Sequence, residues 1–210
     1  MEQTTTGTYR VLPGRDDDEW LLLDVESGDP TYVPRGDAPD LAVGNRVRAD
    51  LAWRDGDPRV ESAAVTDATR FRFVRTTETM FEAATRCWEG AVESGSGMNS
   101  RVTYGTDGDP NGVVYTFAKQ PGQRDLFEEF RDGVKPLEPL LVRAAGGREA
   151  YEEGGVTDGA DPPFETFVID HGEEPFVAVY IVLDPDGFLA ETVRDTYLDA
   201  GSGGGLADRL

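Results

Sequence analysis

Eight apolar residues run without interruption from Phe176 to Leu183, in the order FVAVYIVL, and constrain the fold more than any other stretch. Pro175 precedes the run, and the turn-forming segment Asp184–Gly187 follows it. A short apolar run with firm stops and many β-branched residues is typical of a strand that is buried on both faces of a sheet. We therefore expect a fully buried strand here, which contributes more apolar burial than any other single stretch.

The first third of the chain has a different pattern. Residues 8–74 contain short β-like runs separated by turn residues, with no helix signal, which predicts a small closed barrel of the OB or SH3 type. In Arg46–Trp53 apolar and polar side chains alternate, and Arg46 and Arg48 lie on the polar side. The expected strands are Thr8–Leu12, Trp20–Val25, Thr31–Val33, Arg46–Trp53, Val60–Val65 and Thr69–Val74.

The period of the pattern changes from two to 3.6 near residues 75–77, where we place a domain boundary. Thr77–Glu93 carries an apolar stripe at helical spacing, and Thr79 followed by Glu82 fits a capping box. We expect a β-barrel domain over residues 1–75 and an α+β domain over residues 76–200. Residues 146–163 are Gly-rich and acidic and predict a loop, and residues 201–210 predict a flexible Gly-rich tail.

Two hairpins are expected in the α+β domain. One joins Arg101–Tyr104 to Val113–Ala118, and the other joins Phe164–Ile169 to Phe176–Leu183. Each is followed by an amphipathic helix, one through Phe127 and Phe130, the other through Leu189, Val193 and Tyr197, and a further short helix starts after Pro136 or Pro139. The two units either form an internal repeat or share a few letters by chance. A true repeat predicts one four-stranded antiparallel sheet with helices on one face.

Charge is the strongest compositional signal. The chain holds 20 basic and 41 acidic residues, a net charge of −21, and only Lys119 and Lys135 are lysines. Repulsion among these charges destabilises a compact state in dilute salt, whereas molar salt shortens the Debye length to about 3 Å and screens it. We interpret the balance as adaptation to a salt-rich archaeal cytoplasm. The alternative, an acidic protein that mimics nucleic acid, fits less well because the acids are spread along the chain.

Several function classes are disfavoured by what the sequence lacks. Cys87 is the only cysteine and His171 the only histidine, which excludes an intrachain disulfide and a zinc cluster. No phosphate-binding or dinucleotide-binding glycine motif occurs, so we expect no cofactor and no metal. No run of 18 apolar residues and no signal peptide is present, which predicts a soluble cytoplasmic protein without membrane contact.

The segment Asp107–Gly112, DGDPNG, resembles the opening of a calcium-binding loop. The twelfth position of such a loop should be a bidentate Glu, but here it is Ala118, and the flanks are expected to be strands. We favour a hairpin turn in which Pro110 and Asn111 occupy the central positions and Gly112 accepts a positive φ.

Candidates for catalysis are few. Cys87 lies on the apolar stripe of its helix and His171 in an expected turn, so a Cys–His pair is disfavoured. Acid–base work by a carboxylate pair stays open, because 41 acidic residues allow many pairings. Asn99, Ser100 and Arg101, before the first hairpin, form a candidate polar site, with loop solvation as the simpler interpretation.

The distribution of charge favours binding over catalysis. Residues 43–75 contain seven Arg and five acids, so this window is +2 and the rest of the chain is −23. Basic and aromatic residues together suit RNA or DNA, with Arg on phosphates and rings on bases. We take Arg46, Arg48, Arg70 and Arg72 as the candidate contacts for nucleic acid or a ribonucleoprotein. The simpler alternative is that Arg pairs with Asp across strands while Phe71 and Phe73 fill the core.

Several segments, among them GNRVRADLAW, GMNSRVTYGTDGDPNGVVYTFA and DLFEEFRDG, resemble a family of uncharacterised proteins from haloarchaea. The resemblance implies a halophilic cytoplasmic source and carries no activity or catalytic residue with it. We therefore keep two hypotheses: a non-enzymatic binding module that acts through the barrel, or an enzyme of unknown reaction with a carboxylate-lined site in the α+β domain. The sequence leaves the oligomeric state open.

Overall fold

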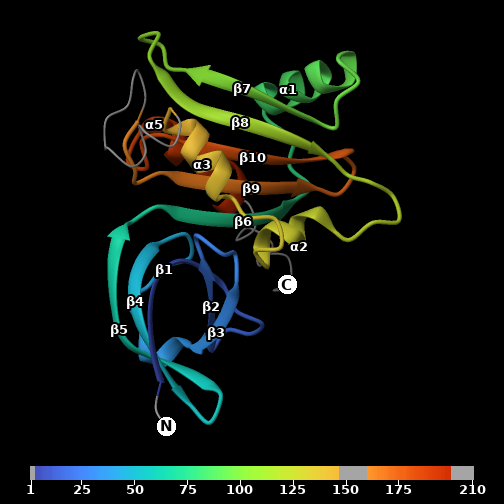
Figure 1. Cartoon of the computed structure of the whole chain (residues 1–210). Helices are drawn as coiled ribbons and strands as arrows, with labels where there is room; N and C mark the ends of the chain where they lie inside the picture. Colours follow the sequence, from blue (N-terminus) through green and yellow to red (C-terminus); the bar gives the residue numbers. More distant parts are fainter. Residues whose placement is uncertain (1–2, 147–159, 200–210) are drawn as a thin grey trace, which may run out of the picture.

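The computed structural model describes residues 3–146 and 160–199 of the chain. Two five-stranded sheets make up the molecule, and the helices gather around the second sheet (Figure 1). This mixed architecture confirms the α+β class. The expected loop at 146–163 and the expected tail at 201–210 fall largely or wholly outside the described residues.

The first sheet is antiparallel, has the strand order β3-β2-β1-β4-β5, and curls around its own core (Figure 1). Side chains such as Val11, Trp20 and Leu51 fill that core. In chain order its elements are β1 (Gln3–Pro13), β2 (Glu19–Asp24), β3 (Pro30–Pro34), the 3-10 helix η1 (Arg35–Asp37), β4 (Arg46–Arg54) and β5 (Asp57–Asp67).

The expected closed barrel is not formed by a continuous backbone ladder among the described residues. β3 and β5 approach each other but remain the two edges of the sheet. β3 is short, and proline at both of its ends removes two backbone donors. Side chains bridge the seam instead: Arg59 on β5 donates from Nε and Nη2 to the Asp37 carboxylate, at 2.7 and 2.6 Å.

The assignment of Thr69–Val74 to the barrel is wrong. These residues form β6 (Arg70–Thr76), which pairs in parallel with β9 of the second sheet. The chain turns out of the first sheet where the Asp67 carboxylate accepts hydrogen bonds from the N–H and hydroxyl groups of Thr69. The period-two pattern correctly predicts a strand here, but it does not specify which sheet the strand joins.

The second sheet has the order β6-β9-β10-β8-β7. Its other strands are β7 (Met98–Tyr104), β8 (Pro110–Ala118), β9 (Glu165–His171) and β10 (Phe176–Val182). All seven residues of β10 are buried, which confirms the prediction from the apolar run. Both predicted hairpins are present, β7 with β8 and β9 with β10, and β8 joins β10 to make the expected antiparallel unit.

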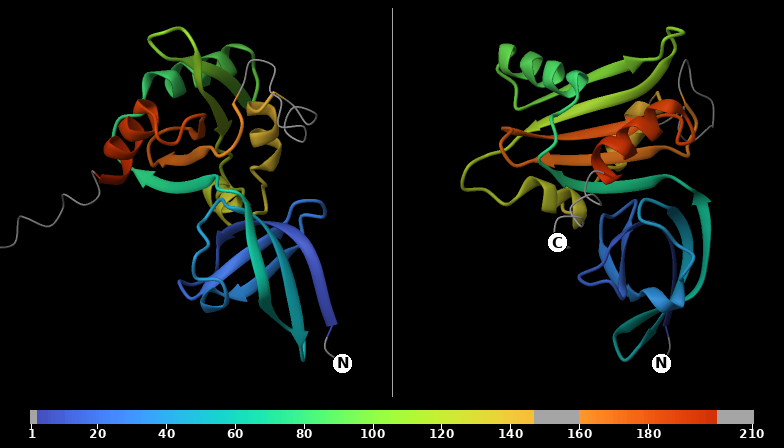
Figure 2. Two further views of the ribbon diagram at one scale, coloured as in Figure 1. Left: turned by 90° about the vertical axis from the view of Figure 1, so that its left-hand side faces the viewer. Right: turned by 180° about the vertical axis from the view of Figure 1, so that it is seen from behind.

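Helices cover both faces of this sheet, which corrects the expectation of one covered face (Figure 2). On one face Phe127, Phe130 and Leu141 pack against β8, β9 and β10, and on the other face Ala84, Cys87 and Val193 do so. The helices are α1 (Glu82–Glu93), α2 (Leu126–Arg131), α3 (Glu138–Ala144), α5 (Phe188–Arg194) and the π-helical turn η2 (Asp195–Asp199).

The expected capping box of α1 is absent. Phe81 occupies the N-cap position and makes no side-chain cap hydrogen bond. The carbonyl of Thr79 accepts a hydrogen bond from the Tyr197 hydroxyl at 3.0 Å, and Glu82 forms an ion pair with Arg86. The start of α1 is therefore held by a tertiary contact with Tyr197 of η2 and not by the side-chain cap that the local sequence predicts.

One buried apolar cluster spans the junction between the two sheets. Leu12 and Leu23 of the first sheet belong to the same buried cluster as Phe71 of β6, Phe130 of α2 and Leu137. Part of this junction is not filled and leaves a cavity between the two sheets.

Candidate functional site

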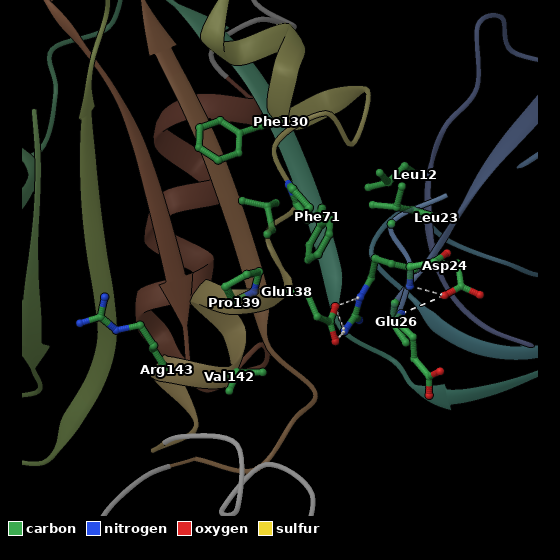
Figure 3. Close-up of a pocket in the computed structure, with 16 residues that line it drawn as sticks. Leu12, Leu23, Asp24, Glu26, Phe71, Phe130, Glu138, Pro139, Val142 and Arg143 are labelled. Carbon is green, nitrogen blue, oxygen red and sulfur yellow. Dashed lines mark hydrogen bonds and ion pairs between the residues drawn. The ribbon is translucent and has the colours of Figure 1, made fainter. Parts of the chain in front are cut away.

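A cavity of about 470 Å³ lies between the two sheets (Figure 3). Leu12 and Leu23 form one wall, and Phe71, Phe130 and Val142 line the other. The turn after β2 and the start of α3 form its rim. Apolar clefts of roughly 300–1,000 Å³ with a few polar groups are the usual form of small-molecule sites.

Arg10 lies in the wall of this cavity with its side chain only 4% exposed. Its Nε and Nη2 atoms donate to the two carboxylate oxygens of Glu138, both at 2.9 Å. Its Nη1 atom donates to the carbonyl oxygen of Gly44 at 2.7 Å and to the Asp67 carboxylate at 3.2 Å. One guanidinium group thus faces two carboxylates, and it links β1, β5 and α3.

The rim carries two further carboxylates. The Asp24 Oδ1 atom accepts hydrogen bonds from the backbone N–H groups of Glu26 and Ser27, both at 2.9 Å, and thereby holds the turn. The Glu26 side chain is exposed on the same turn. Arg143 also lines the cavity, but its guanidinium group extends away from the other labelled side chains (Figure 3).

A second depression, the arginine groove, is lined by Arg70, Arg72, Arg131, Phe71 and Phe73 and has a volume of about 540 Å³. The end of β1, the segment before β4 and η2 complete it, and none of its lining residues is acidic. Arg70 is exposed and makes no ion pair or side-chain hydrogen bond within the described ranges.

The other two arginines of the groove have acidic neighbours. Arg72 donates from Nε to the buried carboxylate of Glu165 at 2.9 Å, and Arg194 donates to the second oxygen of the same carboxylate at 2.7 and 2.9 Å. Arg131 lies 3.4 Å from the Asp132 carboxylate and 3.9 Å from that of Glu128. Two arginines therefore compensate the single negative charge of Glu165, and this pairing holds Arg72 in place at the edge of the groove.

The four arginines predicted as nucleic-acid contacts do not form one surface. Arg70 and Arg72 line the arginine groove, whereas Arg46 and Arg48 on β4 line a smaller depression of about 330 Å³ beside Thr66. Arg46 lies opposite Asp67 in the β4–β5 register, as the cross-strand alternative expects, but Arg48 lies opposite Ala64. The two pairs separate because β6 belongs to the second sheet.

The candidate polar site on β7 is not a convergent cluster. The Asn99 amide donates to the carbonyl of Cys87 at 2.9 Å and ties this edge strand to α1. Ser100 and Arg101 are exposed, and Arg101 lines an open depression beside Tyr180. The side chains alternate across the strand, so that only a structural role of Asn99 is evident.

The remaining catalytic candidates have structural surroundings. Burial raises the pKa of the Cys87 thiol, which accepts a hydrogen bond from the Thr116 hydroxyl at 3.4 Å, so the reactive thiolate is disfavoured. His171 accepts a hydrogen bond from the backbone N–H of Glu173 at its Nδ1 atom. The carboxyl pKa values that depart from their ordinary range in the described residues are lowered by hydrogen bonds, most strongly from Arg15 to Glu19, Arg59 to Asp37 and Thr6 to Asp50.

A hairpin turn joins β7 to β8, as expected, but it lies at residues 105–109 and includes only the first half of the DGDPNG segment. The predicted placement with Pro110 and Asn111 at its centre and a positive φ at Gly112 is wrong, because the positive φ falls four positions earlier. Gly108 has the positive φ of 89°, and Gly105 and Asp109 close the turn through a backbone hydrogen bond of 2.8 Å, while β8 already begins at Pro110. Within residues 3–146 and 160–199, no group of three or more His, Cys, Asp or Glu side chains is placed to hold a metal ion.

Two features of these sites escape sequence analysis. The pairing of Arg10 with Glu138 spans 128 positions, and no local pattern indicates it. Arg131 is surrounded in the sequence by acidic residues, among them Asp132. It therefore does not belong to a basic segment that would indicate a binding role. Both positions depend on the contact between the two sheets.

The chain belongs to the family of unknown function DUF6663, whose family model matches residues 1–202. This membership agrees with the resemblance to an uncharacterised family. A search of curated proteins finds no match. No helix in the described part of the chain is both long enough and apolar enough to cross a membrane.

Proposed function

We propose that this DUF6663 member is a non-enzymatic binding protein that holds single-stranded nucleic acid, RNA or DNA, in its arginine groove. The observation that carries the proposal is that three arginines and two phenylalanines line one groove, without an acidic residue among its described lining, in a chain of net charge −21. Arginine donates in a planar fork to phosphate oxygens, and an aromatic ring accepts a stacked base.

The burial and pairing of these side chains suit such a role. Arg70 is exposed and unpaired in the described structure, so that it contacts a phosphate without first giving up a partner. Arg72 uses its Nε atom for Glu165, which leaves its terminal nitrogens for a ligand. Phe73 is half-buried, in edge contact with Phe71 and Phe127 at ring-centroid distances of 6.5 and 6.0 Å.

The first sheet adds a fold-level argument. Five curled antiparallel strands that stay open at one seam are typical of the OB-fold, which binds oligonucleotides on one face and through two loops. In this chain the loop between β1 and β2 carries Asp16, Asp17 and Asp18, which repel a polyanion. We therefore assign the contact to the arginine groove at the end of the sheet, with Arg46 and Arg48 as a second candidate surface.

The proposed setting is a halophilic cytoplasm. Molar salt weakens phosphate contacts because counterion release then gains little, so that stacking on Phe73 must supply a larger share of the affinity. The acidic remainder of the chain disfavours non-specific binding of nucleic acid to other surfaces.

The test is fluorescence anisotropy with labelled single-stranded U20 and dT20 across a series of KCl concentrations. Replacing Arg70 with Glu should weaken binding at least tenfold, which corresponds to about 1.4 kcal/mol, and should lower the salt slope by about one. Arg86→Glu is the matched control, because Arg86 is also exposed but lies on α1, and it should change affinity less than twofold.

The double variant Arg46→Glu with Arg48→Glu distinguishes the two surfaces. If only this variant loses binding while its circular dichroism is unchanged, the contact lies on β4 and not in the groove. Absence of binding by the wild-type protein at every salt concentration would overturn the proposed function.

A further inference from the structure

The inter-sheet cavity of Figure 3 is separate from the arginine groove and calls for a different ligand. The two share Phe71 but are otherwise lined by different side chains, and the cavity walls are mainly aliphatic and aromatic. We propose that this cavity binds a small apolar organic molecule that carries one cationic group, such as an ammonium.

The apolar part of the ligand follows from the walls. Leu12, Leu23, Phe130 and Val142 face a space of about 470 Å³, which is enough for an aromatic ring and a short alkyl chain. Burying such a group between Leu and Phe side chains is favourable in proportion to the apolar area removed from water.

The charge of the ligand follows from the polar groups. Arg10 cannot serve as an anion receptor, because its guanidinium group already donates to Glu138, Asp67 and the Gly44 carbonyl. Within the cavity lining Glu138 offsets the charge of Arg10, and Asp24 and Glu26 add two carboxylates at the rim. The guanidinium group of Arg143 extends away from these side chains (Figure 3), and the described lining residues carry three carboxylates against two arginines, so that their net charge is negative.

These features place the two ends of the ligand. Its apolar body would lie between Leu23 and Phe130, and its ammonium group would lie at the rim near Glu26 and Asp24. A carboxylate in the same position would meet the like charges of these two side chains. The cavity should therefore discriminate between two molecules that share an apolar body and differ only in the sign of their charge.

The experiment is isothermal titration of the full-length protein with 4-phenylbutylamine and with 4-phenylbutanoate, at matched ionic strength. The amine should bind at least tenfold more tightly than the carboxylate, and added KCl should reduce this preference because it screens the rim charges. Equal affinities, tighter binding of the carboxylate, or no binding of either compound would each overturn the proposal.

Two pairs of variants place the bound amine. Val142→Trp fills the cavity and should abolish binding, whereas Val134→Trp adds the same ring at an exposed position outside the cavity and should not. Glu26→Gln should weaken amine binding at least threefold, and Glu61→Gln, an equal charge change on exposed β5, should leave it unchanged.

The glutamate pair keeps the test decisive if Val142→Trp does not fold, because Glu26 lies exposed in a turn. Amine binding that resists both Val142→Trp and Glu26→Gln would show that the compound binds elsewhere, and the proposal would then be wrong. Oligonucleotide binding at the arginine groove is measured independently, so that failure at one site leaves the other unaffected.

Discussion

At the scale of single residues, Arg10 is a buried charged group that several partners hold in place. It is a charged side chain almost removed from water, and it connects elements that lie far apart in the sequence. Buried ion pairs add little net stability when they form, but losing one partner is costly because the remaining charges are left without compensation.

Replacing Arg10 with Met should therefore destabilise the protein by about 3–5 kcal/mol, since Asp67 and Glu138 lose their shared cation. Arg15→Met is the matched control: Arg15 also forms a bidentate pair, with Glu19, but its side chain is 66% exposed, and the expected loss is about 1 kcal/mol or less. Denaturation in urea at constant salt measures both. Equal losses would contradict the assigned importance of burial.

A second substitution tests the cause of that loss. Adding Glu138→Gln to the Arg10→Met variant removes one of the uncompensated charges and should recover part of the stability. If Glu138→Gln instead lowers the free energy of unfolding of the Arg10→Met variant further, lost packing and not uncompensated charge causes the destabilisation.

At the scale of elements, Gly44 sets how closely the first sheet approaches β6. Its φ is 99°, and a Cβ atom at this position would lie 2.3 Å from the backbone nitrogen of Phe71. That nitrogen donates to the carbonyl of Val43, and Gly44 itself donates to the carbonyl of Val11, so the contact is part of a backbone network.

Gly44→Ala should lower stability by at least about 2 kcal/mol, because it combines a disfavoured left-handed conformation with displacement of the β6 backbone. Gly28 has a similar φ of 75° but open space around its Cβ position, so Gly28→Ala should show only the conformational cost of about 1 kcal/mol. Thermal unfolding of both variants makes the comparison, and equal shifts would show that β6 moves at little cost.

Local sequence pattern predicts where the strands and helices of this chain lie better than it predicts which of them pair or pack together. The apolar run gives the buried β10, and the turn residues give both hairpins, because hairpin partners are adjacent in sequence. Local pattern places β6 in the wrong sheet, because its parallel partner β9 begins at Glu165, far along the chain. The capping box failed for a related reason, since Tyr197 supplies the contact at the start of α1.

At the scale of the whole molecule, the sites depend on the junction between the sheets. The sequence indicates Arg70 and Arg72 through their basic window, but it does not bring Arg131 beside them. The cavity is less predictable still, because its walls come from β1, β2, β6, α2 and α3 and its residues resemble ordinary core residues. Only the packing of one sheet on the other creates either feature.

The net charge of −21 predicts how the whole molecule responds to salt. Salt has two opposing effects here: it weakens exposed ion pairs such as Arg15–Glu19 and Arg75–Asp125, and it screens repulsion among the acids. Exposed pairs contribute only about 0–1 kcal/mol each, and the buried network around Arg10 is little screened, so the relief of repulsion should dominate.

The thermal midpoint should therefore rise steeply between dilute buffer and molar KCl, by roughly 10 °C if screening supplies about 3 kcal/mol in a chain of this size. A sucrose solution of the same osmolality as the KCl solution controls for a general solute effect.

The triple variant Asp16→Asn, Asp17→Asn, Asp18→Asn tests whether charge repulsion causes the salt response. Removing three neighbouring charges from an exposed loop should raise the thermal midpoint in dilute buffer more than in molar KCl. An unchanged or lower midpoint at high salt would contradict the halophilic interpretation, and the excess of acids would then need a partner of opposite charge to explain it.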